Sequence, residues 1–449
     1  MKQLFCLRSA LILSAIIIGA LWGTTSASAQ TMVGLGVLPG DTSSGASGVS
    51  ADGSVVVGNS YSAVSNTNAA FKWTASTGMV GLGFLPGYAN SLATGISADG
   101  STIVGYGFND FYVGPEYFFQ LEAFVWTADT GLIGLGTLPG YASSAALGIS
   151  ADGSTIVGVC LTVDNGSFVQ QQAFRWTAAT RMVGLGYLPN GVFSEAAGVS
   201  ADGSVVVGSS YDNVGGEAFV WTASAGMVGL GQVPGDFLST NATGVSADGS
   251  TVIGIRYGIS SEAFAWTPDN GMIGLGYLLG DSRSVALGTS ADGSTIVGFS
   301  GNDHDHLEAF AWTDATGLVG LGYVPGDSSS FASSISSDGS TIVGYSGTNQ
   351  RGEAFLLRLN VAPADLIIAL TQQVVGLNLH HGTQNSLTAK LEAALKSIDQ
   401  ANNDSQAKAV NNLNAFINEV QAQRGNKIPI VDADALIAAA LRIIDLLHA

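Results

Sequence analysis

The chain has 449 residues, of which 46% are hydrophobic and only 11% are charged, and its formal net charge is −19. This composition excludes a disordered chain, because it supplies ample apolar material for a large core. The negative charge argues against nucleic acid and anionic membrane surfaces as partners, since both would be repelled.

The first thirty residues have the features of a secretory signal peptide. Lys2 and Arg8 give a positive start, residues 10–23 form a short apolar run, and Ala27-Ser28-Ala29 is a small-residue cleavage signal. The apolar run is shorter than a membrane span usually requires. We therefore expect residues 1–29 to be removed and the protein to be secreted or held at the cell surface, without a membrane span in the mature chain. An uncleaved N-terminal anchor is the alternative.

The mature chain keeps a single cysteine. Cys6 lies in the expected signal peptide, which leaves Cys160 alone. An internal disulfide is therefore impossible, and the fold must depend on packing. Because Cys160 lies in an apolar stretch, we interpret it as a small buried hydrophobic residue.

A phrase close to MVGLG occurs seven times along the chain. It begins at Met32, Met79, Leu132, Met182, Met227, Met272 and Leu318, with spacings of 47, 53, 50, 45, 45 and 46 residues. Each unit also contains a GVS phrase, an ADGSVVVG phrase and an AFKWT phrase. The β-branched and aromatic runs favour strands, so each unit predicts four short strands separated by turns.

An Asp-Gly pair separates the first two predicted strands of every unit. This pair is a strong hairpin signal and predicts a type I′ turn, in which both central residues have positive φ. The aspartates are Asp52, Asp99, Asp152, Asp202, Asp248, Asp292 and Asp338. Pro-Gly after the fourth strand, as at Pro39-Gly40 and Pro86-Gly87, suits a type II turn.

The predicted strands are apolar on both faces, which a half-exposed sheet would not tolerate. Stacked blades cover both faces, and the repeat length and strand count fit a propeller. We therefore expect residues 30–360 to form an all-β fold, a seven-bladed β-propeller of four-stranded blades. The last unit ends at Ala354-Phe355 without a fourth strand, so the segment Met32–Val37 is expected to complete that blade.

These phrases resemble the HAF-repeat family of bacterial extracellular proteins over residues 32–358. The matching text is G-V/I-S-A-D-G-S-x-V/I-V-G, then A-F-x-W-T, then G-M-V-G-L-G-x-L-P-G. The resemblance implies an exported repeat protein and no known reaction. The His that gives the family its name is absent here, since the position holds Ala69, Glu122, Gln172, Glu217, Glu262, Glu308 and Glu353.

Residues 361–449 lose the strand pattern and gain helical periodicity. Val410, Leu413, Ile417 and Val420 fall on one helix face, and Leu387, Leu391, Leu395 and Ile398 do likewise. Gly425 is a plausible helix stop and Asp432 a plausible cap. We expect a small α-helical bundle, and the text NSLTAKLEAAL and ADALIAAALRII is similar to a FIMAH domain, which implies an accessory or interaction module.

Three groups of polar residues invite a functional interpretation. The repeated aspartates suggest Ca²⁺, but one per turn supplies too few ligands, so we interpret them as structural turn residues. The repeated glutamates before Ala-Phe could do acid–base work, although their repetition indicates structural placement. His304, Asp305 and His306 could bind zinc, but no third ligand is evident and a solvated loop is expected.

The loop between the second and third strands is longest in the second unit and carries many aromatics. Tyr106, Phe111, Tyr112, Tyr117 and Phe118 form the expected ligand patch, with local packing as the alternative. We find no catalytic, cofactor or metal site in the sequence. We therefore predict a non-catalytic, secreted or cell-surface binding scaffold for a polysaccharide or protein. A glycan-acting hydrolase or lyase and a structural matrix or assembly protein are the alternatives, and the oligomeric state stays open.

Overall fold

The computed structural model describes residues 32–113, 116–164, 167–231, 239–258, 260–302, 306–348, 351–359, 363–377, 379–398 and 403–448. The expected signal peptide therefore lies outside the described residues. Strands occupy the chain from Val33 to Arg358, and helices follow from Pro363.

Seven sets of four antiparallel strands, here called blades, make up the strand region. Blade 1 contains β2 (Ser43–Val49), β3 (Val55–Ser62), β4 (Thr67–Thr74) and β5 (Gly78–Gly83). Blade 2 contains β6 (Asn90–Ile96), β7 (Thr102–Val113), β8 (Glu116–Thr127) and β9 (Gly131–Gly134). Blade 3 contains β10 (Ser143–Ile149), β11 (Thr155–Asp164), β12 (Ser167–Thr177) and β13 (Arg181–Gly186). Blade 4 contains β14 (Phe193–Val199), β15 (Val205–Tyr211), β16 (Gly216–Thr222) and β17 (Gly226–Gly229).

The remaining blades repeat the same order. Blade 5 contains β18 (Ser239–Val245), β19 (Val252–Tyr257), β20 (Glu262–Thr267) and β21 (Gly271–Gly276). Blade 6 contains β22 (Arg283–Thr289), β23 (Ile296–Gly301), β24 (Leu307–Thr313) and β25 (Gly317–Gly320). Blade 7 contains β26 (Ser329–Ile335), β27 (Thr341–Gly347) and β28 (Gly352–Arg358), and its fourth strand is β1 (Val33–Gly34). A single parallel pair, Gln171 with Phe193, joins blades 3 and 4 into one eight-stranded sheet.

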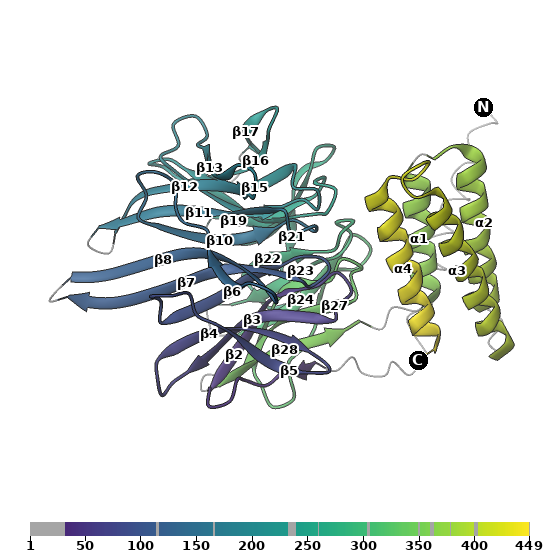
Figure 1. Ribbon diagram of the computed structural model, residues 1–449, viewed down its shortest axis with the longest axis horizontal. Coiled ribbons are helices and arrows are strands. Elements are labelled where there is room, and N and C mark those ends of the chain that lie inside the picture. Colours follow the sequence, from purple (N-terminus) through teal and green to yellow (C-terminus); the bar gives the residue numbers. More distant parts are fainter. Residues whose placement is uncertain are drawn as a thin grey trace, which may run out of the picture. The chain divides into compact units, whose positions relative to one another are not determined.

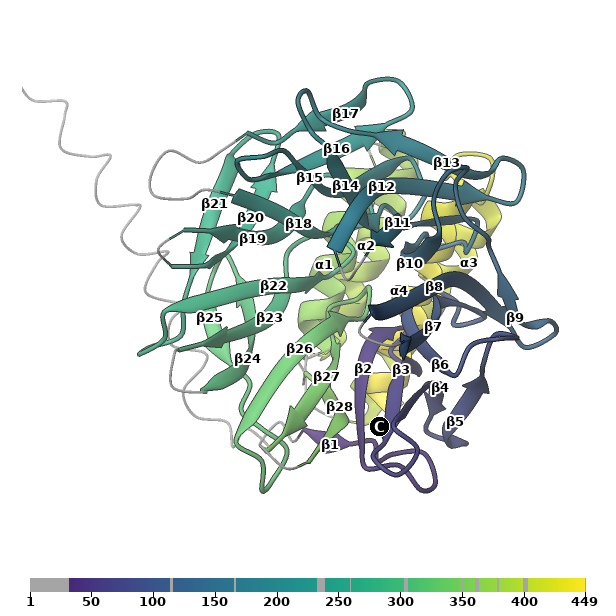
Figure 2. The same cartoon turned by 90° about the vertical axis from the view of Figure 1, so that its left-hand side faces the viewer.

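The N-terminal strand completes the last blade, as the sequence predicts. Val33 pairs with Leu356 and Gly34 with Phe355, and Figure 2 shows purple β1 beside green β28. The chain therefore brings its first strand and its last strand into one sheet, so this outer strand of blade 7 comes from the start of the chain.

Each blade buries the Ala-Phe pair of its third strand. Ala70 and Phe71 are fully buried in blade 1, and the equivalent phenylalanines are fully buried in all seven blades. Ala and Phe lie on opposite faces of the strand, so a blade must be covered on both sides. Phe71 packs in a cluster with Val343 and Ala354 of blade 7, which shows how neighbouring blades cover each other. Burial of one such phenylalanine contributes about 1.5–3 kcal/mol.

A buried hydroxyl joins every blade to the next. Ala123 N donates to Ser144 Oγ at 2.9 Å, and Ser144 Oγ donates to Gly136 O at 2.6 Å. The same bond to a hydroxyl on the second residue of the inner strand recurs at every neighbour. The seventh joins Ala354 of blade 7 to Ser44 of blade 1, at 2.9 Å. With these contacts and the strand order, the fold is the expected seven-unit β-propeller (Figure 1).

Four helices follow the strands: α1 (Pro363–Gly376), α2 (His381–Ile398), α3 (Asn403–Gln423) and α4 (Ile430–His448). Each contacts two of the others, and Leu391, Leu413 and Val420 are buried in their common core. Gly425 follows α3 with φ of 72°, as a helix stop requires. Asp432 does not cap α4: the helix begins at Ile430, which places Asp432 in its first turn, where a carboxylate favours the helix dipole. In the described part of the chain, no helix has both the length and the apolar content needed to cross a bilayer.

Candidate functional site

The two ends of the propeller differ in what they carry. In blade 4, Val199 pairs with Val206 at one end of the hairpin, and Phe193 pairs with Tyr211 at the other. We call the first end, which holds the seven Asp-Gly turns, the Asp end. The second end, which holds the turns between blades and the hairpins between second and third strands, is the loop end.

At the Asp end, each aspartate is a local turn residue. Asp202 Oδ1 accepts hydrogen bonds from Ser200 Oγ at 2.7 Å and from Ser204 N at 2.9 Å. Ser200 Oγ in turn accepts from Val205 N at 3.0 Å. The same bonds recur at the other six aspartates. These carboxylates therefore close their own turns.

The expected type I′ turn is wrong. Positive φ occurs at Gly203, with 72°, and at its six equivalents, but at none of the aspartates. Gly203 N donates to Ser200 O, so the turn closes one residue earlier and its central residues are Ala201 and Asp202. The reason is the serine before each turn, whose hydroxyl and carbonyl both bond within it and select a turn followed by a left-handed glycine. The Pro-Gly turns agree with expectation, since Asp41 N donates to Leu38 O and Gly40 has φ of 92°.

These hydrogen bonds also favour the charged form of Asp202 and Asp52. Bonds from Ser204 and Ser200 lower the pKa of Asp202 below its ordinary value of 3.8. For Asp52, burial acts in the opposite direction, but the bonds from Ser50 and Ser54 outweigh it and the pKa is again lowered. Hydrogen bonds to the charged form explain both shifts.

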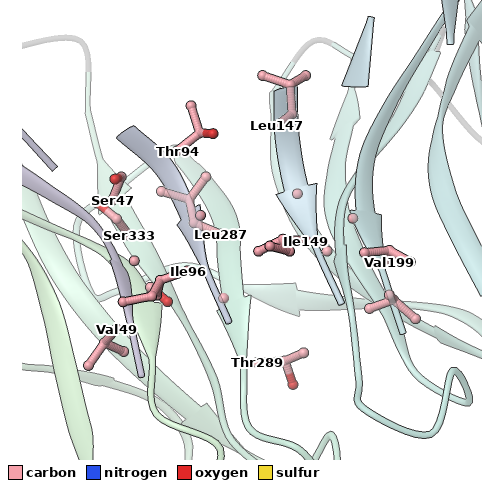
Figure 3. A pocket seen from close by; sticks show the side chains of 18 residues that line it. Ser47, Val49, Thr94, Ile96, Leu147, Ile149, Val199, Leu287, Thr289 and Ser333 are labelled. Carbon is pink, nitrogen blue, oxygen red and sulfur yellow. The ribbon is translucent and has the colours of Figure 1, made fainter. Parts of the chain in front are cut away.

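A central channel of about 220 Å³ is lined by all seven inner strands (Figure 3). Its lining contains only Gly, Ser, Thr, Val, Ile and Leu. Ser47 Oγ donates to Ala93 O at 2.6 Å and Thr94 Oγ1 to Ala146 O at 2.9 Å, so these hydroxyls join neighbouring blades. The lining therefore holds no acid, base or activated nucleophile.

The repeated glutamates before Ala-Phe lie against the outer strand of their own blade. Glu217 Oε1 accepts from Gly231 N at 3.0 Å, and Glu262, Glu308 and Glu353 make the equivalent bond. A Cβ on Gly229 would overlap the Glu217 carboxylate, which explains the glycine opposite this position. Glu262 also pairs with Arg256. Structural placement therefore accounts for these carboxylates.

The expected aromatic loop is a pair of strands. Phe111 lies opposite Phe118 and Tyr112 opposite Tyr117 in the hairpin of β7 and β8, because aromatic residues favour extended pairing. The side-chain positions of these four residues lie outside the described part of the structure. Tyr106 is described: its ring lies 6.2 Å from that of Phe108, and both pack on a cluster that includes Leu121 and Val159. Its contacts are those of local packing.

At the loop end of blade 6, His306 lies in a polar cluster. His306 Nδ1 lies 3.1 Å from Asp281 Oδ1, and Nε2 lies 3.0 Å from the Tyr323 hydroxyl. Glu308 Oε2 is 4.0 Å from Nε2. The Asp281 side chain is 2% exposed, and within the described part of the chain its Oδ2 has no hydrogen-bond partner. His304 and Asp305, expected to belong with His306, lie outside the described residues.

A second polar cluster at the loop end joins three blades. Glu195 accepts hydrogen bonds from the Tyr211 hydroxyl at 3.1 Å and from Gln171 Nε2 at 3.2 Å. Asn241 Nδ2 donates to the same hydroxyl at 2.7 Å. Burial raises the pKa of Glu195 despite these two bonds. Burial and the Glu195 carboxylate both raise the pKa of Tyr211.

Partly exposed aromatic side chains also occur at the loop end, on different blades. Phe84 and Tyr187, in turns between blades, are 47% and 36% exposed, and Tyr257, at the end of β19, is 41% exposed. The hydroxyls of Tyr141 and Tyr187, in consecutive turns, lie 3.0 Å apart. Within the described ranges, no three His, Cys, Asp or Glu side chains are arranged to hold a metal ion.

Sequence reasoning missed both loop-end clusters and the aromatic turn residues. It treated the loop that contains His306 by itself, whereas Asp281 and Tyr323 approach it from turns before and after the blade. An available signal was the third residue of each inner strand, which varies between units and is charged only at Glu195. Deviations from the repeat, rather than the repeat, mark these residues.

Neither a protein-family model nor a curated protein matches the chain. Solved structures do match at low identity. TolB from Acinetobacter baumannii is 13% identical with a TM-score of 0.39, over 65% of this chain and 76% of that one. Oligogalacturonate lyase from Vibrio parahaemolyticus is 12% identical with a TM-score of 0.48, over 75% and 95%. The Dos1 propeller is 11% identical with a TM-score of 0.41, over 74% and 95%. At these scores, we draw nothing about function from them.

Proposed function

We propose that this protein is an exported, non-catalytic propeller scaffold whose loop end binds a polysaccharide. The observation that carries the proposal is that partly exposed Phe84, Tyr187 and Tyr257 all lie at that end, on different blades, and that the Tyr187 hydroxyl lies beside that of Tyr141. An aromatic ring offers an apolar face to the carbon skeleton of a sugar, and tyrosine adds a polar hydroxyl. Neutral glycans fit best, because the net charge of −19 repels anionic ones.

The absence of catalysis is supported by how the carboxylates are used. The channel lining carries no titratable side chain. The repeated aspartates and glutamates bond to backbone amides within their own blades, as Asp202 does with Ser204 and Glu217 with Gly231. A residue held in this way stabilises the fold and is not free to transfer protons to a substrate.

Export is proposed from the N-terminal sequence and from the resemblance to HAF-repeat proteins. Lys2, Arg8 and the apolar residues 10–23 have the order of a signal peptide. The helices α1–α4, similar in sequence to a FIMAH domain, would add a second interaction module. Cys160 suits an oxidising compartment, since it is buried and burial raises the pKa of its thiol to about 11.

One observation favours a second candidate, a glycan-acting enzyme. Glu195 is a carboxyl group with a raised pKa that occurs in one blade only, and a general acid requires such a group. Turnover of a glycan that disappears in the Glu195→Gln variant would support this candidate. Binding of the glycan without turnover would support the scaffold.

Retention on a glycan array and on insoluble cell-wall polysaccharide tests the proposal. We expect the full chain to retain a defined class of neutral glycan. The Tyr187→Ala and Tyr257→Ala variants should lose that retention, and Thr77→Ala, at an exposed turn of the Asp end, should keep it. Absence of any retained glycan, or equal loss in the Thr77 variant, would contradict the proposal, and retention of protein partners instead would favour an assembly role.

A further inference from the structure

The third residue of the inner strand is different in every blade. It is Gly45, Leu92, Ala145, Glu195, Asn241, Val285 and Phe331 in blades 1 to 7. Two of the seven are polar, and they occupy adjacent blades. The flanking residues repeat, as the buried hydroxyls of Ser194 and Thr240 show. The frame is therefore constant here while one side chain per blade is free to vary.

The hydrogen bonds of this cluster leave an acceptor unused. The Tyr211 hydroxyl donates a hydrogen bond to Glu195 and accepts one from the Asn241 amide, so its single donor is used within the cluster. Asn241 Oδ1 is buried and has no hydrogen-bond partner among the residues that the structure describes. A buried acceptor without a donor costs folding free energy, so its presence calls for a missing donor.

The Glu195 carboxylate also has lone pairs that accept no hydrogen bond from its two donors. Its two hydrogen-bond donors, Tyr211 and Gln171, are neutral groups, and burial is the largest influence on its pKa, which is raised. One carboxylate oxygen accepts from each donor, which leaves lone pairs on both oxygens. A further donor would therefore improve the solvation of this carboxylate.

A partly exposed aromatic side chain lies on the strand that pairs with the strand of Asn241. Tyr257 is 41% exposed and pairs in register with Ser239, two residues before Asn241 on β18. Burial, and then the Glu195 carboxylate, raises the pKa of Tyr257, so the two side chains are within electrostatic reach. The cluster thus combines unused acceptors with an aromatic face.

We propose that Glu195, Gln171, Tyr211, Asn241 and Tyr257 form a subsite for one neutral sugar unit. Asn241 Oδ1 and the Glu195 carboxylate accept hydrogen bonds from sugar hydroxyls, and the Tyr257 ring packs on the carbon face of the sugar. The carboxylate excludes uronic acids by charge repulsion. This assignment rests on the proposed polysaccharide binding and adds to it the position of a subsite and the neutral class of sugar.

The test uses isothermal titration of the full chain with cellohexaose, laminarihexaose, mannohexaose and tri-galacturonate. We expect at least one neutral hexasaccharide to bind and tri-galacturonate not to bind. Glu195→Gln and Asn241→Leu, which keep side-chain volume, should each raise the dissociation constant about tenfold. Glu217→Gln is the matched control, since Glu217 accepts a hydrogen bond from the backbone of Gly231 in the same blade, and it should bind like the unaltered protein.

The pH profile gives a second readout that a structural role would not produce. Binding by the unaltered protein should weaken as acidification protonates Glu195, while binding by Glu195→Gln should stay constant over the same range. If a neutral hexasaccharide binds equally well to both variants with an unchanged profile, the subsite is overturned and the scaffold role stands. If none of the four oligosaccharides binds and the glycan array is also blank, the subsite and the proposed function both fail.

Discussion

The Asp end and the loop end of this propeller use the same residue types for different purposes. At the Asp end, seven aspartates make the same bonds to the same serines, as at Asp52 and Asp202. At the loop end, Glu195 and His306 have partners from turns and strands that differ between blades. Repetition therefore marks residues that build the frame, and departure from repetition marks the residues at which we propose binding.

Folding also shifts the pKa of Asp99 and Asp202, at the Asp end, and of Glu195, at the loop end, in opposite directions. Hydrogen bonds lower the pKa of Asp99 and Asp202 at the Asp end. Burial raises the pKa of Glu195 at the loop end. Asp99 and Asp202 thus stabilise the fold, whereas the Glu195 carboxylate opposes folding, which is common at binding sites.

The largest expected effect on stability comes from adding a methyl group at a repeated glycine. The same change at a variable position serves as the comparison. A Cβ on Gly58, repeated in every unit, would overlap the carbonyl oxygen of Gly45 on the paired strand. Gly58→Ala should lower the free energy of unfolding by about 2–3 kcal/mol. Gly45→Ala, at the variable position, has its nearest atom 4.0 Å away on Tyr345 and should change little. Urea unfolding of both variants decides, and equal losses would refute the distinction between repeated and variable positions.

A smaller effect is expected from one Asp turn. Asp202→Ala removes the acceptor for Ser200 Oγ and Ser204 N, which should cost about 1 kcal/mol. Asp202→Asn retains an acceptor oxygen and should recover most of that loss. Thermal unfolding at neutral pH measures both variants. If Asp202→Ala is as stable as the unaltered protein, the carboxylate does not hold the turn.

Acidification should change the stability contributions of Asp202 and Glu195 in opposite directions. The contribution of Asp202 is present above its ordinary pKa of 3.8 and is lost as the pH falls through the lower folded value. The contribution of Glu195 is present below 4.5 and is lost as the pH rises through the raised folded value. Relative to the unaltered protein, Glu195→Gln should therefore be more stable at pH 7 and nearly equal at pH 4. Unfolding curves at both pH values check this, and a penalty that grows toward pH 7 would contradict it.

The smallest expected signal is the reactivity of Cys160. Its thiol is buried and burial raises its pKa to about 11, so at neutral pH little thiolate is available. Thiol-reactive dye should label the native protein very slowly and the urea-unfolded protein quickly. Rapid labelling of the native state would show that blade 3 opens more readily than its packing indicates.

The blade structure could be predicted from the sequence because the same phrases repeat seven times. The Asp-Gly turns, the Ala-Phe strand and the pairing of Met32–Val37 with the last unit follow from phrases that repeat. The turn type was missed, since the choice depends on bonds from serines such as Ser200 that the pair itself does not encode. The loop-end clusters were missed because their members, such as Gln171 and Asn241, are distant in sequence and meet only when blades stack.

Hydrogen–deuterium exchange with a neutral hexasaccharide tests the central claim most directly. If the loop end binds, added ligand should slow exchange in residues 193–197, 209–216, 239–243 and 253–257 of blades 4 and 5. Exchange in the Asp turn of residues 200–204 should be unchanged in the same spectra. Protection confined to the Asp turns or to helices α1–α4 would contradict the assignment of binding to the loop end.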